Sequence, residues 1–473
     1  MRYACLILAL AVLLSGCTID PHYASEKLFW QAEQKIRSFV EEKKGKLTKE
    51  DLQVVIAAYR EAIQPNPFDI LAAQAQFAIV KIYMTQKEYD KAQAELQDIV
   101  NNFSSNPRIA SRAQFAIGQI FELKGEQEKA LQAFEKITDL YPLSPLGLQM
   151  PIYLINYYKK INDKDAEEKA FRKSVRHYEQ IIYDYAGTSV ASLVQDYLAR
   201  TYVQVDDVQS ALKTWDDIMT RYPDTPQAVK ASFAKAEIYV VKMKDIPKAI
   251  KIYEDTIKEF PDANFIKDAK LRLGDLYLAN NQVEKGQAIF STLIKDYPQD
   301  ERVSLRSRFA LVESFKKQGL QEKVTEGYQE IMQSYPDSPN ALAVPYLMYR
   351  YYSKLEDRDA SQLLNKAISQ YKNELNKRSA KEEIVVVSQL LFLCYADSKQ
   401  WTMALNLLGN LSYKYPDDPG FLLSMASLYR NQLNNPRKAI DIYSKVIENF
   451  SSNKPLVTLV TKQIEALSKS LSE

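Results

Sequence analysis

Glycine is scarce in this sequence, with 12 residues in a chain of 473. So little glycine disfavours turn-rich β architectures and glycine-rich phosphate-binding loops. Neither a P-loop nor a G-x-G-x-x-G motif occurs. Lysine and arginine (62) nearly balance aspartate and glutamate (60), and no acidic tail is present. We therefore expect no nucleic-acid partner.

Histidine is scarcer still, with only His22 and His177, which lie far apart in the sequence. A histidine-based metal site or a Ser-His-Asp triad needs more than isolated histidines. Carboxylates are plentiful, so an acid pair is the one catalytic alternative, but those at 163–168 are typical of a solvated turn and helix start. The sequence therefore predicts no catalytic residue, no metal, no cofactor and no enzymatic role.

Cysteine occurs three times, and two of the three lie in the first seventeen residues. This segment has Arg2 followed by an apolar run over 4–14, too short for a mature membrane span of roughly 20 residues but typical of a secretory signal. Only Cys394 lies elsewhere, so no disulfide framework can form. Because Cys394 sits in the apolar stretch "QLLFLCYA", we expect a buried structural thiol rather than a nucleophile.

The sequence Leu-Ser-Gly-Cys at 14–17 resembles the lipobox of bacterial lipoproteins. The resemblance implies that residues 1–16 are removed as a lipoprotein signal peptide and that Cys17 is lipid-modified; an ordinary signal peptide with a chance cysteine is the alternative. In diderm lipoproteins, aspartate directly after the cysteine commonly signals retention in the inner membrane. Thr18 stands there, and Asp20 comes two places later. We expect an outer-membrane lipoprotein facing the periplasm, or one on the extracytoplasmic face in a monoderm.

Aromatic–proline pairs followed by short polar turns recur along the chain. Their prolines stand at positions 142, 223, 261, 298, 336 and 416, which gives steps of 37 or 38 and two double steps of 80 or 81. A period of about 38 to 40 residues indicates a solenoid or repeat array. Within 265–299, apolar residues recur at helical spacing in two blocks that "ANNQ" separates. Each repeat is therefore predicted to be a helical hairpin.

These units resemble the tetratricopeptide repeat, whose pattern sets Leu–Gly, Tyr, a small residue, an aromatic residue and Pro at fixed offsets. One unit matches it with Leu273, Gly274, Tyr277, Gly286, Phe290 and Pro298, and the match recurs over most of 68–452. Small residues let paired helices approach closely, while aromatic residues fill the space between hairpins, which must stack to bury their apolar faces. The fold predicted is an all-α solenoid of about eleven hairpins with a C-terminal capping helix.

The recurring turn is predicted to end one helix and begin the next. Pro223 ends a helix because it lacks an N–H and clashes with the preceding turn, Thr225 is a good N-cap, and Pro226 suits the first helical position. Thr48 with Asp51 suggests a capping box near the N-terminus. The same cap–proline device is predicted at Ser144–Pro145, Ser338–Pro339, Asp418–Pro419 and Asn435–Pro436.

A longer repeat lies over the short one, since Pro142 plus 194 is Pro336. Two irregular units match at this shift, and we expect Pro151 and Pro345 in them to occupy the first turn of a shifted helix or to kink it. The predicted divisions are a signal peptide (1–16), a lipidated tether (17–23), a divergent hairpin (24–67), two five-hairpin blocks (68–262 and 263–452) and a capping helix (453–473).

In this repeat family, the first helices of successive hairpins line a concave face. The resemblance implies a partner-binding groove carrying Phe77, Phe115, Phe233, Phe309, Arg112, Arg200 and Arg306. An aromatic stripe with charges suits an extended peptide or a partner helix. Alternatively, the phenylalanines pack between neighbouring first helices. A second candidate surface comprises Tyr157, Tyr158, Tyr351 and Tyr352 of the irregular units, where core packing is the expected role.

Lipobox and repeats together resemble the repeat modules of the β-barrel assembly machinery lipoprotein and of the Tol–Pal periplasmic repeat protein. The resemblance implies a lipid-anchored, non-catalytic scaffold that binds envelope proteins or extended peptides in cell-envelope assembly or maintenance. A pilot or accessory lipoprotein of a secretion, pilus or polysaccharide-export machine is the alternative. An envelope glycan-acting enzyme is a third hypothesis.

Overall fold

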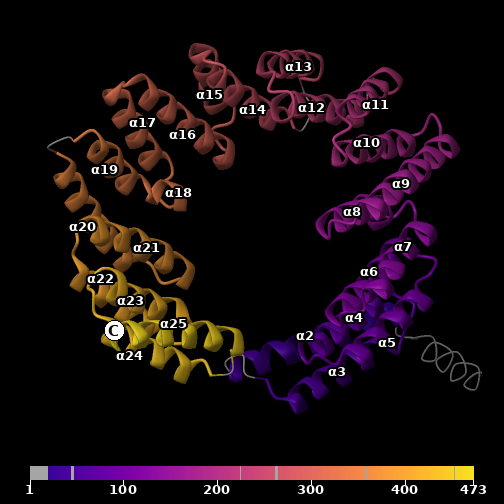
Figure 1. Ribbon diagram of the computed structural model, residues 1–473, viewed down its shortest axis with the longest axis horizontal. Helices are drawn as coiled ribbons and strands as arrows, with labels where there is room; N and C mark the ends of the chain where they lie inside the picture. The colour runs from indigo at the N-terminus through magenta and orange to yellow at the C-terminus, as the bar shows by residue number, and fades with distance from the viewer. Residues whose placement is uncertain are drawn as a thin grey trace, which may run out of the picture. The chain divides into compact units, whose positions relative to one another are not determined.

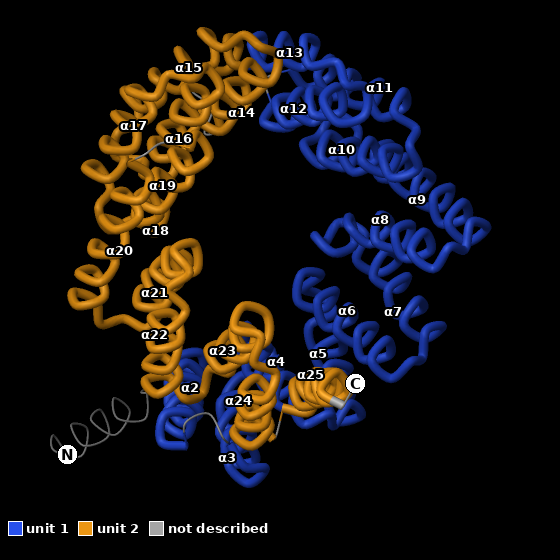
Figure 2. The backbone as a smooth tube through the Cα atoms, turned by 60° about the vertical axis from the view of Figure 1, so that its left-hand side comes forward, with its two compact units in different colours: residues 1–256 blue, residues 257–473 orange. Residues whose placement is uncertain are grey.

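The computed structural model describes residues 20–43, 47–223, 225–261, 265–356, 359–451 and 453–472. Every regular element in these ranges is an α-helix (Figure 1). The predicted signal peptide and Cys17 lie outside the described residues. The chain divides into two compact units, one ending at Thr256 and the other beginning at Ile257 (Figure 2). This boundary lies close to the predicted one at 262/263.

The first unit is a series of helical hairpins in which each helix from α2 to α11 packs against the next one in the chain. First helices also contact one another, as α6 does with α8 and α10 with α12. The helix α2 begins at Pro21, inside the segment predicted as a tether. The helices are α2 (Pro21–Glu42), α3 (Lys49–Ile63), α4 (Ile70–Thr85), α5 (Tyr89–Asn102), α6 (Pro107–Leu123), α7 (Gln127–Leu140), α8 (Pro145–Lys160), α9 (Lys164–Asp184), α10 (Ser189–Gln204), α11 (Val208–Arg221), α12 (Pro226–Val241) and α13 (Ile246–Glu259), whose last residues pass the boundary.

The second unit repeats this arrangement and ends in the single helix that was predicted to cap the array. Its final helix, α25 (Lys454–Ser472), packs on α24. The preceding helices are α14 (Ile266–Ala279), α15 (Val283–Asp296), α16 (Glu301–Gln318), α17 (Gln321–Ser334), α18 (Pro339–Leu342), α19 (Val344–Lys354), α20 (Ala360–Lys377), α21 (Lys381–Asp397), α22 (Trp401–Lys414), α23 (Pro419–Asn431) and α24 (Pro436–Asn449).

The helix bounds repeat at the interval of 194 residues that the prolines suggested. Adding 194 to the bounds of α5 (89–102) gives those of α15 (283–296), and the same holds for α7 (127–140) and α17 (321–334). The aromatic residue of the aromatic–proline pair is the C-cap of the second helix in these hairpins, as predicted for a helix-ending signal. These C-caps are Tyr141, Tyr222, Tyr297, Tyr335 and Tyr415.

Each predicted N-cap residue stands at the start of a helix. Thr48 and Asp51 form a capping box at α3, and the side chains of Ser144, Thr225, Asp418 and Asn435 accept backbone hydrogen bonds at their helix starts. Ser338 is the N-cap of α18 and Pro339 follows it in the first helical turn, as predicted, but the Ser338 side chain makes no capping hydrogen bond. The helix it precedes, α18, has only four residues and is followed by a break at Ala343.

The two prolines of the irregular hairpins take different positions. Pro151 lies inside the continuous helix α8, whereas Pro345 lies in the first turn of α19, after the break. A buried tyrosine of the following helix donates to a carbonyl just before each proline: Tyr178 to Leu148 at 2.6 Å and Tyr371 to Leu342 at 2.8 Å. Each accepting carbonyl lies three residues before its proline, next to the carbonyl four residues back that lacks a helical donor because proline has no N–H.

Candidate partner-binding site

The predicted groove phenylalanines all lie on first helices and are half-buried. In unit 1, Phe115 of α6 packs against Phe134 of α7, with ring centroids 5.4 Å apart, and against Tyr153 of α8 at 6.1 Å. Phe233 of α12 stacks on Tyr253 of α13 at 5.0 Å. These two rings therefore contribute to packing between helices, and only their remaining surface can meet a partner.

Phe77 of α4 meets a predicted groove arginine. The guanidinium carbon of Arg112, on α6, lies 4.5 Å from the centroid of the Phe77 ring, which is a cation–π distance. Arg112 itself is exposed. This pair links the first helices of two successive hairpins and presents one cation beside one aromatic ring.

The other two predicted arginines are exposed and each pairs with a carboxylate. The Nε of Arg200 lies 2.7 Å from Asp196, one turn earlier on α10. Arg306 of α16 lies 2.7 Å from Asp275 of α14. Surface ion pairs typically contribute only about 0–1 kcal/mol, so the two exposed guanidinium groups remain available to an acidic partner.

One cavity in unit 2 brings two predicted groove residues together. Arg306 and Phe309 line a cavity of about 700 Å³ between α16 and the start of the next hairpin. Leu305 and Leu347 give it further apolar surface, and Asn340 and Arg302 add polar groups. None of the other predicted groove residues lines this cavity. This combination of aromatic, aliphatic and cationic groups suits an extended peptide.

A second cavity on unit 2 was missed by the sequence reasoning. It has a volume of about 460 Å³ and lies between α21, α22 and α23. Its lining includes Phe392, Leu393 and Phe421, and Leu393 is 40% exposed. The sequence does contain a signal for this cavity, because Phe392 occupies the repeat position that glycine holds at Gly274. Both positions are followed by tyrosine after three residues and by a small residue after twelve.

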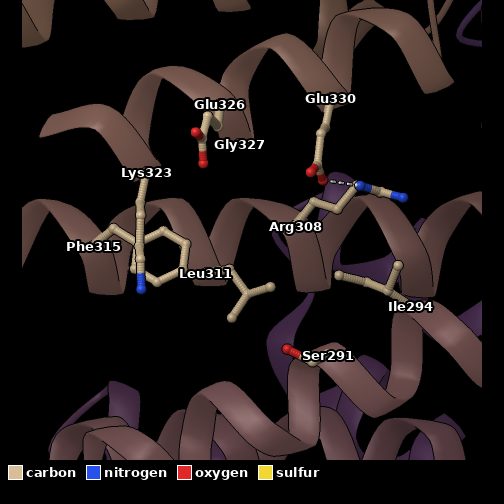
Figure 3. Close-up of a pocket in the computed structure, with 9 residues that line it drawn as sticks. All are labelled: Ser291, Ile294, Arg308, Leu311, Phe315, Lys323, Glu326, Gly327 and Glu330. Atoms are coloured by element: carbon tan, nitrogen blue, oxygen red, sulfur yellow. Dashed lines mark hydrogen bonds and ion pairs between the residues drawn. The ribbon is translucent and has the colours of Figure 1, made fainter. Parts of the chain in front are cut away.

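A third cavity in unit 2 is lined by residues of two second helices and of the first helix between them (Figure 3). It has a volume of about 420 Å³ and is lined from α15, α16 and α17. Arg308 pairs with Glu330 at 2.6 Å, and Lys323 lies over the Phe315 ring at 5.4 Å. The positive charges therefore already have partners, and the arrangement contains no activated nucleophile.

The tyrosines of the irregular hairpins make ring and hydroxyl contacts within the unit to which they belong. The Tyr157 and Tyr158 rings lie 5.5 Å apart, and the Tyr351 and Tyr352 rings 5.1 Å apart. The Tyr157 hydroxyl donates to Gln127 at 2.6 Å. All four side chains are half-buried, so packing accounts for much of their surface.

The titratable groups that might serve catalysis or metal binding are dispersed. Among the described residues, no cluster of three or more His, Cys, Asp or Glu side chains could hold a metal ion. Burial lowers the pKa of His177 and raises the pKa of Cys394 to about 12, which keeps its thiol protonated. In the described ranges, none of the helices combines the length and apolar character that crossing a membrane requires.

Comparison with known proteins identifies the repeat. Models of the tetratricopeptide repeat match residues 77–145, 240–308 and 421–453. The fold is an all-α solenoid of tetratricopeptide repeats. Repeats of this kind indicate a protein-interaction scaffold, and such scaffolds are generally non-catalytic. No curated protein matches the chain.

Several solved structures resemble the solenoid at low identity. A structure of Naa15/Naa10 bound to HypK-THB has a TM-score of 0.36 and 14% identity, covering 93% of this chain and 65% of that chain, so the solenoid spans less than two thirds of its length. Yeast Tom70 has a TM-score of 0.35 and 12% identity, covering 95% and 99% of the two chains. A putative kinesin light chain from Podospora anserina has a TM-score of 0.29 and 16% identity, covering 40% and 96%.

Proposed function

We propose that this protein is a lipid-anchored, non-catalytic scaffold that binds protein or peptide partners in cell-envelope assembly or maintenance. The tetratricopeptide repeats carry the scaffold part of the proposal. The lipobox-like sequence at 14–17 supports the anchor, and Thr18, in the place where aspartate commonly signals inner-membrane retention, supports an outer-membrane location facing the periplasm. The start of α2 at Pro21 leaves residues 18–20 as the tether, which reaches about 10 to 15 Å when extended. The repeats would then begin at the membrane surface.

The cavity of Arg306 and Phe309 is the proposed contact for part of a partner. It offers a cation, an aromatic face and aliphatic surface on the first helices, which favours an extended segment with acidic and apolar side chains. Arg306 is the better residue to test, because it is exposed and its pair with Asp275 contributes little to stability.

A crosslinked pull-down of the full-length protein from its own envelope tests the scaffold role. We expect one dominant protein partner, lost with Arg306→Glu and retained with Tyr413→Asp, whose side chain is exposed on the second helix α22. A β-barrel partner supports an assembly role, whereas a secretin or export channel supports the accessory role. If the wild type has no reproducible partner, the scaffold proposal is wrong.

A separate fractionation experiment tests the anchor. We expect Cys17→Ala to give a soluble or mis-processed protein, and we expect the wild type to carry an acyl modification on Cys17 by mass spectrometry. If the variant still fractionates entirely with membranes, lipid on Cys17 is not what holds the protein there. That outcome would leave the scaffold role intact.

A further inference from the structure

Exposed aromatic side chains gather at the N-terminal end of the described chain. Trp30 of α2 is 61% exposed, and Phe68, just before α4, is 69% exposed. Every other tryptophan and phenylalanine in the described ranges is partly or fully buried. Tyr23, in the first turn of α2, adds a third ring that is 60% exposed. Large exposed side chains concentrated in one region mark an interaction surface, whereas scattered ones do not.

The exposed face of α2 carries its rings close to the start of the helix. Tyr23, Lys27 and Trp30 follow one another at intervals of four and three residues, so they share one face. Phe29, on the other side of the helix, packs against a tyrosine of α3. Two turns beyond Trp30 the exposed face carries a charged residue, Arg37. The aromatic part of this face is therefore the part nearest the N-terminus.

A side-chain contact brings the turn before α4 to the same end of the unit. The Nδ1 of His22, in the first turn of α2, lies 2.7 Å from an oxygen of Asp69. Asp69 stands between Phe68 and Ile70, and Ile70 is 59% exposed. Tyr23 directly follows His22. The start of α2 and the start of α4 therefore present their exposed apolar side chains close together.

The chain before α2 indicates what lies opposite these side chains. In the proposed function Cys17 carries lipid, and residues 18–20 reach about 10 to 15 Å when extended, which holds the start of α2 near the bilayer. Tyrosine and tryptophan concentrate at membrane–water interfaces because their rings are apolar and carry one polar atom. The exposed Lys27 is offset by the exposed Asp20 and Glu26, so charge supplies no net attraction to anionic lipid.

We propose that the exposed rings at this end, together with the neighbouring isoleucine, rest in the headgroup region of the phospholipid bilayer. This membrane-contact surface consists of Tyr23, Trp30, Phe68 and Ile70. The inference rests on the proposed lipid anchor and goes beyond it, because a tether alone does not orient the protein. Contact through these side chains fixes the first hairpin against the bilayer.

Tryptophan fluorescence tests the proposal. The full-length protein, purified from its own membranes, is reconstituted into phosphatidylcholine vesicles with or without brominated acyl chains, because bromine quenches only rings that reach the bilayer. Of the three tryptophans, Trp215 is 2% exposed and Trp401 is partly buried. We expect brominated lipid to remove most of the share of the emission that Trp30→Phe removes, and to leave the emission of Trp30→Phe unchanged.

Moving the reporter provides the matched control. In the Trp30→Phe protein, Phe68→Trp should restore quenching by brominated lipid, whereas Tyr183→Trp should not. Tyr183 is 80% exposed on α9, three hairpins farther along the same unit. Equal quenching at positions 68 and 183, or equal quenching of the wild type and Trp30→Phe, would overturn the proposal.

Vesicle flotation separates this proposal from the proposed anchor. A wild type that floats with the vesicles but is not quenched would overturn the membrane-contact surface and leave the anchor intact. A wild type that does not float would contradict the anchor and the surface together. If Trp30 is shielded from aqueous iodide but is not quenched by brominated lipid, a second copy or another protein covers it, and the proposal is wrong.

Discussion

At the scale of single residues, burial decides the chemistry of Cys394. The thiol is fully buried in α21, and desolvation raises its pKa to about 12. The thiolate is the reactive form, and almost none is present at neutral pH. We expect no iodoacetamide adduct on the Cys394 peptide when native protein is treated at pH 8, and complete labelling after denaturation, both read by mass spectrometry. Equal labelling rates in the two states would show that the thiol is accessible.

His22 is a pH-dependent link between the first two hairpins. Its Nδ1 lies 2.7 Å from an oxygen of Asp69, the N-cap of α4, and this hydrogen bond raises the pKa of His22 above its ordinary value of 6.5. A raised histidine pKa stabilises the folded state fully below pH 6.5, and the contribution is lost as the pH rises through the folded-state pKa.

An NMR titration of the imidazole checks this prediction. We expect the pKa of His22 to lie above 6.5 in the wild type and to fall in Asp69→Asn, which keeps a good N-cap residue. His177, whose pKa burial lowers, is the internal reference and should not move. A His22 pKa that is the same in both proteins would show that the pair with Asp69 does not form in solution.

At the scale of helix pairs, close approach depends on glycine facing an aromatic ring. A Cβ on Gly118 would lie 2.3 Å from Phe134, whereas a Cβ on Gly409 would meet nothing within 4 Å. Overpacking typically costs about 1–3 kcal/mol, which exceeds the gain of up to about 1 kcal/mol from replacing a helical glycine by alanine. We expect Gly118→Ala to lower the midpoint of thermal unfolding and Gly409→Ala to raise it slightly. Shifts of the same sign would contradict this account.

The two equivalent serine caps give a second comparison at this scale. Ser144 accepts a hydrogen bond from the N–H of Gly147 at 2.9 Å, and Ser338, 194 residues later, accepts none. Removing a functioning N-cap typically costs about 1 kcal/mol. Denaturant unfolding should therefore show Ser144→Ala to be destabilised by about that amount and Ser338→Ala by less than about 0.5 kcal/mol. A larger loss at Ser338 would mean that its cap forms in solution.

The sequence predicted helix pairs and helix ends well because their causes are local. Proline at Pro223, the cap at Thr225 and the spacing of small and aromatic residues act within a few positions. Breaks within a helix could not be predicted from such local signals. Pro151 and Pro345 occupy equivalent positions, yet one stays inside a helix and the other follows a break. That difference depends on neighbouring packing, which a repeat pattern does not encode.

The candidate site shows the same division. The repeat register correctly placed Phe115 and Phe233 on first helices. It could not show that the rings of Phe134 and Tyr253 cover part of their surface. It also could not show that Arg306 and Phe309 share a cavity, because that needs side chains from the next hairpin. The contact of His22 with Asp69 joins residues 47 positions apart and was equally invisible.

At the scale of the whole molecule, stacked hairpins provide long surfaces rather than one enclosed pocket. Each unit is built from hairpins that bury their apolar faces only against neighbours, as repeat arrays do. In unit 2, the first helices line the cavity of Arg306, and they line the cavity of Leu393 together with Leu408 and Leu411 of the second helix α22. Tyr413 of α22 is 91% exposed and lines neither cavity. The central claim is that partners bind along the first helices.

Site-specific photo-crosslinking in the native envelope tests that claim most directly. A photoreactive amino acid is placed singly at Arg306, at Leu393 or at Tyr413 of the full-length protein, and crosslinked products are identified by mass spectrometry. We predict that positions 306 and 393 crosslink to a protein partner and that position 413 does not. Crosslinks from position 413 with none from positions 306 and 393 would contradict the account and place the binding surface on the second helices.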